Sequence, residues 1–250
     1  MPAFSEFREP FVGGGSVCLA LRQRHPNAPF WINDLNAELY HFWLCLRDCP
    51  DALIQSVQRV KDTVRDGRAL HRSLADDLPT ESLQRAVRFF LLNRITFSGT
   101  VEAGGYSQGA FEKRFTQSSI ERLRSVAPLL SKTTITNLDY GEVASAPGKD
   151  VFIFLDPPYL SATKSKLYGR GGELHTTFDH ERFAAVMRET GHRWLITYDD
   201  CEEVRALFHF AHIVPWELQY GMNNYKQAGA AKGKEVMITN YSPRLSPLFG

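Results

Sequence analysis

The sequence predicts an α/β fold built on an open sheet whose central strands are covered on both faces. Several short runs rich in Ile, Val, Phe, Trp and Thr are typical of strands, and most lack the strict alternation of half-buried strands. Helical segments lie between several of these runs, and such alternation predicts an open α/β sheet. The predicted strands are 29–34, 133–138, 151–155, 193–198, 212–218 and 235–240, and the helices among them are 16–25, 37–47, 180–190 and 201–208.

Composition excludes several classes of protein. The 250 residues carry 29 Lys and Arg against 28 Asp and Glu, and 43% are hydrophobic, which excludes a disordered chain and a polycationic DNA binder. Local basic patches can still bind nucleic acid. The sequence has no apolar run of membrane-spanning length and its first residues lack a secretory pattern, so a cytoplasmic protein is expected.

The cysteines and histidines predict neither a disulfide framework nor a metal site. Cys18, Cys45, Cys49 and Cys201 form no C-x-x-C pair, and the eight histidines show no metal-ligand spacing. Cys45 and Cys49 lie four positions apart in an apolar helical stretch, so buried core thiols are expected.

A glycine-rich turn opens the first half of the predicted sheet. Gly13, Gly14 and Gly15 precede the helix from Ser16, and glycines let a backbone turn sharply and approach a ligand closely. Asp34 follows Gly13 by 21 positions at the end of the next predicted strand, where a carboxylate can accept both hydroxyls of a ribose. The residues alone leave open a plain glycine loop with Asp34 as a helix cap.

The stretch from 50 to 130 contains no convincing strand. It predicts helices near 51–75, 81–93 and 119–130, with Ser118 and Glu121 in the spacing of a capping box, and a glycine-containing loop or hairpin at 97–109. Because Asp34 and Thr133 are 99 positions apart, this connection exceeds a minimal helical crossover by about 80 residues. A second, smaller domain inserted into the sheet domain is therefore predicted.

The apolar strand 151–155 ends directly in Asp156, Pro157, Pro158 and Tyr159, at a position where ligands bind in open α/β sheets. An amino group conjugated to a ring is a poor nucleophile, and a carboxylate and a carbonyl can bind its two hydrogens and free its lone pair. Asp156 can supply the carboxylate and Pro157 the carbonyl, held rigidly by the two prolines. Tyr159 can stack on a flat base. The alternative is a strand ending in a turn with an exposed tyrosine.

These segments together resemble the Dam-like family of DNA adenine methyltransferases, over nearly the whole chain. The segments E-P-F-V-G-G-G-S-V at 9–17, N-D-L-N at 33–36 and L-D-P-P-Y at 155–159 stand in the order of that family. Weaker support comes from L-L-N-R-I-T-F-S-G at 91–99, N-L-D-Y-G-E-V at 137–143 and K-E-V-M-I-T-N-Y at 234–241. The resemblance implies a Rossmann-like methyltransferase sheet with a catalytic domain at 1–49 and 131–250, and a mainly helical target-recognition insert at 50–130.

The resemblance also implies the reaction and its partners. A methyl group would pass from S-adenosylmethionine to the exocyclic amine of an adenine flipped out of double-stranded DNA. The enzyme would be a monomer that needs no metal and associates with the nucleoid through DNA. Asp156, Pro157, Pro158 and Tyr159 would hold the adenine, and the donor would contact Glu9, Pro10, Phe11, Gly13, Gly14, Gly15, Asp34, Asp139 and Tyr140.

Candidate DNA-binding residues come from charge and position. Residues 50–130 hold 12 Lys and Arg against 9 Asp and Glu, and further basic residues, including Lys164 and Lys166, follow the strand ends. Arg94 can contact a phosphate or a base edge, or only cap its helix. Phe97 and Tyr106 can wedge into an opened duplex or pack the loop, and Ser98 stands where the family usually has Asn, so a GATC target is not expected.

The sequence leaves several alternatives open. The family motif W-x-G-G-K is absent ahead of Glu9, so a short start to the catalytic domain is expected. A non-catalytic DNA-binding relative is one alternative, and methylation of cytosine, an RNA guanine or a protein glutamine is another. Asp199 and Asp200 are expected to cap the helix 201–208.

Overall fold

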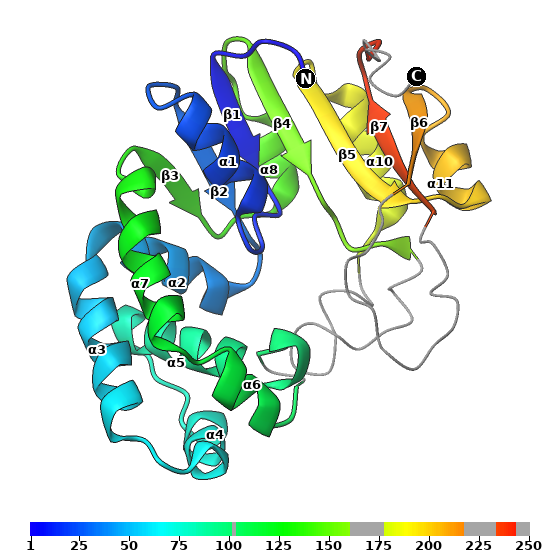
Figure 1. The fold of residues 1–250 in the computed structure, drawn as a ribbon. Helices are drawn as coiled ribbons and strands as arrows, with labels where there is room; N and C mark the ends of the chain where they lie inside the picture. Colours follow the sequence, from blue (N-terminus) through cyan, green and yellow to red (C-terminus); the bar gives the residue numbers. More distant parts are fainter. Residues whose placement is uncertain (102–103, 161–177, 218–233, 244–250) are drawn as a thin grey trace, which may run out of the picture.

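The computed structural model describes residues 1–101, 104–160, 178–217 and 234–243, and it has a seven-stranded sheet in the order β3-β2-β1-β4-β5-β7-β6 (Figure 1). Strands β1 to β5 pair in parallel, whereas β7 runs antiparallel between β5 and β6. The strands are β1 (Glu6–Glu9), β2 (Phe30–Asn33), β3 (Thr133–Thr136), β4 (Val151–Leu155), β5 (Arg193–Asp199), β6 (His212–Glu217) and β7 (Lys234–Thr239). The predicted α/β class is confirmed.

The sheet separates two hydrophobic cores, and the side chains of β4 alternate between them. Val151, Ile153 and Leu155 belong to one core, with α8 (Tyr140–Ser145), α10 (His180–Glu189) and α11 (Glu202–Leu207). Phe152 belongs to the other core, with α1 (Ser16–Arg24) and the helices that follow β2. Because both faces are covered, β4 is apolar throughout, as its sequence predicts.

The helices between β2 and β3 gather beside the β3 end of the sheet (Figure 1). They share one core with β1 and β2, where the Phe42 ring lies 5.5 Å from the Phe89 ring and 6.2 Å from the Phe90 ring. In chain order they are α2 (Ala37–Asp48), α3 (Pro50–Thr63), α4 (Gly67–Asp76), α5 (Ser82–Ile95), η1 (Phe97–Gly99), α6 (Gln108–Lys113), α7 (Gln117–Val126) and η2 (Ala127–Leu130).

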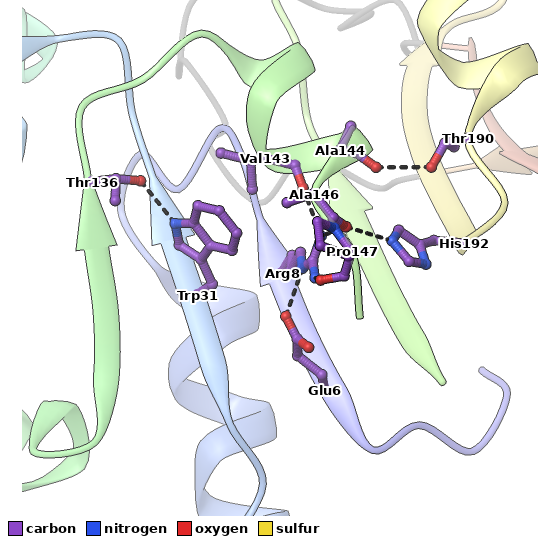
Figure 2. A network of polar contacts seen from close by, with 10 residues as sticks. All are labelled: Glu6, Arg8, Trp31, Thr136, Val143, Ala144, Ala146, Pro147, Thr190 and His192. Carbon is purple, nitrogen blue, oxygen red and sulfur yellow. Dashed lines mark hydrogen bonds and ion pairs between the residues drawn. The ribbon is translucent and has the colours of Figure 1, made fainter. Parts of the chain in front are cut away.

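Strand β1 is not among the strands predicted from the sequence, because it buries charged residues and so lacks an apolar run. The Arg8 side chain donates to the carbonyl oxygens of Val143, Ala146 and Pro147 at 2.9, 2.7 and 2.8 Å (Figure 2). It also pairs with Glu6 at 2.6 Å, and its residue exposure is 1%. Arg8 therefore satisfies carbonyls at the carboxyl end of α8, and this buried polar role gives no hydrophobic pattern by which a strand could be predicted.

Two predictions about the inserted helices are wrong: one predicted helix is interrupted, and another is capped by a different pair of residues. The predicted helix 51–75 breaks at 64–66, where the Asp66 carboxylate accepts from the amides of Arg68 and Ala69 and starts α4. The capping box of α7 is formed by Thr116 and Ser119 rather than by Ser118 and Glu121. The threonine hydroxyl reaches the third backbone amide of the helix, which decides where the helix begins.

The predicted cap of the helix 201–208 is also wrong. Helix α11 begins after Cys201, whose side chain makes no capping hydrogen bond. Asp200 pairs instead with Arg205, at 2.6 Å between Oδ1 and Nε. All four cysteines are free thiols, with Cys18 and Cys45 buried and Cys49 and Cys201 partly buried. Within the described ranges no helix is long and apolar enough to cross a membrane.

Candidate active site

A cavity of about 1040 Å³ lies at the carboxyl ends of β1, β2, β3 and β4. Ligands of open α/β sheets bind at this edge, where the strand order reverses. Helices α2, α5 and α7 supply the opposite wall, with side chains that include Trp43, Arg94 and Arg122. The cavity brings together all the predicted donor-binding and catalytic residues: Glu9, Pro10, Phe11, Gly13, Gly14, Gly15, Asp34, Asp139, Tyr140, Asp156, Pro157, Pro158 and Tyr159.

Trp43 of α2 packs against the glycine turn and hydrogen-bonds to it. The backbone of Gly15 has φ of 68°, and a Cβ there would lie 2.8 Å from two ring carbons of Trp43. The Trp43 indole N–H donates to the carbonyl oxygen of Gly13 at 3.1 Å. At Gly13 and Gly14 a Cβ would meet nothing within 4 Å, so the turn presents bare backbone to the cavity.

Asp34 ties this turn to the end of β2. Its Oδ2 accepts from the amide of Gly13 at 3.1 Å, and its Oδ1 accepts from the amide of Asn36 at 3.0 Å. Burial raises the pKa of Asp34, and these two backbone hydrogen bonds oppose that rise. The cap of α2 is Asn36, so Asp34 is not the helix cap that its position also allowed. A carboxylate has about four acceptor sites, so two remain for hydroxyl groups in the cavity.

Asn33 holds three strand ends together beneath the cavity. Its Nδ2 donates to the carbonyls of Pro10 and Leu138 at 3.1 and 3.0 Å. Its Oδ1 accepts from the Thr136 hydroxyl at 2.7 Å and from the Leu138 amide at 2.8 Å. The side chain is buried and makes all four hydrogen bonds available to it. It therefore fixes the spacing between the segments that carry Phe11, Asp34 and Asp139.

Glu9 is a buried acid at the floor of the cavity. The residue is 3% exposed, and its Oε2 accepts from the Cys18 amide in the first turn of α1 at 2.9 Å. Burial raises the pKa of Glu9 to about 8, and the charges of Asp156 and Asp34 add to the rise.

Asp139 and Tyr140 form one side wall, and Arg182 of α10 holds both. The two guanidinium N–H groups of Arg182 donate to Asp139, at 3.0 Å to Oδ2 and 2.6 Å to Oδ1. The Arg182 guanidinium carbon lies 4.9 Å from the centroid of the Tyr140 ring. Hydrogen bonding to Arg182 lowers the pKa of Asp139, so this carboxyl is ionised. Arg182 has no local sequence signal that marks it as part of the site, because its partner Asp139 lies 43 positions away.

The D-P-P-Y segment continues β4 into the cavity. Asp156 is exposed to the cavity, and its Oδ1 accepts from the Thr197 hydroxyl of β5 at 2.7 Å. The Tyr159 ring stacks on the Tyr198 ring, with centroids 5.9 Å apart and planes at 27°. Tyr198 in turn hydrogen-bonds to His180 Nδ1. Tyr159 is therefore partly buried on a second aromatic ring, unlike the freely exposed tyrosine of the alternative reading.

The predicted DNA-binding residues have different surroundings. Arg94 lines the cavity, its Nε has no hydrogen-bond partner in the described chain, and burial lowers its pKa, helped by the charges of Arg114 and Arg122. Ser98 also lines the cavity, and Phe97 protrudes with 71% exposure. Tyr106 packs against Phe111, with ring centroids 6.4 Å apart.

The remaining two predicted DNA contacts, Lys164 and Lys166, lie outside the described residues. Among the residues that are described, no group of three or more His, Cys, Asp and Glu could hold a metal ion. The cavity thus has a floor and side wall rich in carboxylates, bare glycine backbone, and arginines on the helical wall. It suits a large, partly cationic ligand with hydroxyl and amino groups.

Comparisons with known proteins agree with this geometry. A family model described as "D12 class N6 adenine-specific DNA methyltransferase" matches residues 1–222. A "DNA adenine methylase" of Vibrio cholerae serotype O1 is 25% identical over 98% of this chain and 90% of the relative. A "DNA N-6-adenine-methyltransferase" of Escherichia phage P1 is 24% identical over 84% of this chain and 28% of the relative. A "Type II methyltransferase M1.LlaDCHI" of Lactococcus lactis subsp. cremoris is 24% identical over 72% of this chain and 63% of the relative.

Proposed function

The chain belongs to the D12 class of N6 adenine-specific DNA methyltransferases, and we propose that its cavity binds S-adenosylmethionine beside a flipped-out adenine. The observation that carries the proposal is that the glycine turn, Asp34 and Asp156 lie on one cavity. Two ligands must meet for methyl transfer, and a shared cavity lets the enzyme orient them together.

The residues present fit the donor. Asp34 retains acceptor sites for the two ribose hydroxyls after binding the amides of Gly13 and Asn36. Open space above Gly13 and Gly14 lets the donor lie directly against the backbone. Asp139 accepts a hydrogen bond from the amino group of the donor's adenine, and Tyr140 contacts the adenine ring. When bound, the donor supplies an electrophilic methyl group and leaves as a neutral thioether.

The target adenine is held by the D-P-P-Y segment. The Asp156 carboxylate and the Pro157 carbonyl accept the two hydrogens of the exocyclic amine, so that its lone pair is available to form the new nitrogen–carbon bond. Pro157 and Pro158 fix the backbone that carries these acceptors. Tyr159, already stacked on Tyr198, presents an aromatic face to the base. The methylated nitrogen is cationic and strongly acidic, so it releases one proton to water after transfer, and no strong base is needed at Asp156.

The helical insert faces double-stranded DNA in this proposal, with residues 50–130 as the target-recognition region. Arg94, whose Nε has no partner in the described chain, contacts the DNA together with Ser98. Phe97 is the residue proposed to insert into the opened duplex because it is 71% exposed, whereas the Tyr106 ring packs against Phe111 of α6. Lys164 and Lys166 remain proposed phosphate contacts on sequence grounds alone.

The test separates donor binding from turnover. Calorimetry with S-adenosylmethionine should show at least about 100-fold weaker binding in Asp34→Ala, since two charge-assisted hydrogen bonds of about 1.5 kcal/mol or more each are lost. Asp156→Ala should bind the donor nearly as the wild type does but methylate DNA at least about 100-fold more slowly. Asp48→Ala, an exposed carboxyl paired with Arg47 outside the cavity, is the control and should change neither. Unchanged donor affinity in Asp34→Ala, or wild-type turnover in Asp156→Ala, would contradict the proposal.

A further inference from the structure

Thr197 of β5 lies beside Asp156, where β4 ends. The parallel pairing of β4 with β5 sets Leu155 opposite Ile196, and the next residues of the two strands are Asp156 and Thr197. Leu155 and Ile196 both enter the core formed with α10, so alternation turns Asp156 and Thr197 to the other face of the sheet. The two side chains are therefore neighbours across adjacent strands.

The Thr197 hydroxyl has one hydrogen and two acceptors within reach. Its oxygen lies 2.7 Å from Asp156 Oδ1 and 3.4 Å from the carbonyl oxygen of Leu155. The shorter distance is the usual one for a hydroxyl donor, and the charged carboxylate is the stronger acceptor. The hydroxyl thus donates to the carboxylate.

This bond restrains a carboxylate that is otherwise exposed to the cavity. Thr197 is 7% exposed and fixed in its strand, whereas Asp156 lies beyond the last residue of β4. Among the described residues, no hydrogen bond to the Asp156 carboxylate other than that of Thr197 is found. A single short bond at Oδ1 fixes the rotation of the carboxylate and leaves Oδ2 available as an acceptor in the cavity.

We propose that Thr197 is a positioning residue for methyl transfer: its hydroxyl holds Asp156 so that Oδ2 meets the amine of the target adenine. This inference rests on the proposed role of Asp156. A small rotation of the carboxylate would move the acceptor away from the amine, and misplacement by about 1 Å can cost about 100-fold in rate. Loss of the hydroxyl should therefore lower kcat and leave donor binding intact.

The decisive comparison uses Thr197→Val, which keeps the shape and removes the donor, and Thr197→Ser, which restores it. The matched control is Thr239→Val in the neighbouring strand β7. Thr239 is also buried, and its hydroxyl donates to the Tyr241 carbonyl at 2.7 Å outside the cavity. Each variant is assayed for methyl transfer to DNA purified from a methylation-free host, for S-adenosylmethionine affinity by calorimetry, and for melting temperature.

We expect Thr197→Val to lower kcat by about 10- to 100-fold with donor affinity within about threefold of the wild type. Thr197→Ser should recover most of the rate, and Thr239→Val should keep it. If Thr197→Val does not fold, Thr197→Ala takes its place against Thr197→Ser. Wild-type kcat in a folded variant without the hydroxyl, or an equal loss in Thr197→Ser, would overturn the inference.

Asp156→Ala is measured alongside, because it separates this inference from the function on which it rests. Wild-type turnover by Asp156→Ala would mean that the proposed function is wrong. An inactive Asp156→Ala together with a fully active Thr197→Val would overturn the role of Thr197 alone.

Discussion

Glu9→Gln should make the protein's stability less dependent on pH. An ordinary glutamic acid has a pKa near 4.5, and burial raises that of Glu9 to about 8. Below pH 4.5 the side chain is protonated in both the folded and the unfolded chain. Between pH 4.5 and 8 only the unfolded chain releases the proton, so the free energy of unfolding falls as the pH rises.

The size of the effect follows from the interval. Each pH unit in which only one state is protonated changes the free energy of unfolding by about 1.4 kcal/mol. Between pH 5.5 and 8 the wild type should therefore lose about 3 kcal/mol through Glu9. Glutamine is uncharged, has nearly the same shape, and can still accept from the Cys18 amide, so Glu9→Gln should not show this loss.

Urea denaturation at pH 5.5 and at pH 8 measures the difference. Between pH 5.5 and pH 8 the free energy of unfolding of the wild type should fall by about 3 kcal/mol relative to that of Glu9→Gln, whichever protein is the more stable at pH 5.5. Other titrating groups, such as Asp34, are present in both proteins and cancel. Glu189→Gln, which removes an exposed carboxyl, is the control and should follow the wild type. Equal pH dependence in wild type and Glu9→Gln would show that Glu9 does not hold its proton more tightly in the folded chain than in the unfolded chain.

Three further substitutions test the site and its support. Gly15→Ala should lower stability by about 1–3 kcal/mol and weaken donor binding, because its φ is 68° and its Cβ would press on Trp43; calorimetry and thermal melting check both. Arg8→Met should lower stability by about 3 kcal/mol, seen as a melting temperature lower by about 6–12 °C, because three carbonyls lose a buried charged donor. Arg182→Met should cost less than about 1 kcal/mol of stability, since its pair with Asp139 is half exposed, but should weaken donor binding several-fold by releasing Asp139; an unchanged dissociation constant would contradict this.

The apolar strands can be predicted well from local sequence, because a strand buried on both faces is a continuous run of apolar residues. The run 151–155 coincides with β4, and 133–138 differs from β3 only at its end. Strand β1 is different, since its sequence E-F-R-E hides Arg8 and Glu9 in polar networks that exist only after α8 and α1 have packed. Helix starts depend on which side chain reaches a free amide, as at Thr116 and Asp66, and sequence spacing allows several choices.

The cavity could be anticipated where motifs carry it. The glycine turn, Asp34 and the D-P-P-Y segment each follow a strand, so topology alone brings them to one edge. The side chains that hold them could not be anticipated in the same way. Trp43, Arg182 and Thr197 act across 30, 43 and 41 positions of sequence, and each is an ordinary residue within its own helix or strand.

The most direct test is made in a bacterial host whose own DNA is unmethylated. The host expresses either the wild-type chain or Asp156→Ala, and its DNA is sequenced with detection of modified bases. We predict N6-methyladenine at a recurring sequence with the wild type and no such modification with Asp156→Ala. Unmodified DNA with the wild type, methylation of cytosine instead, or equal adenine methylation with Asp156→Ala would contradict the account.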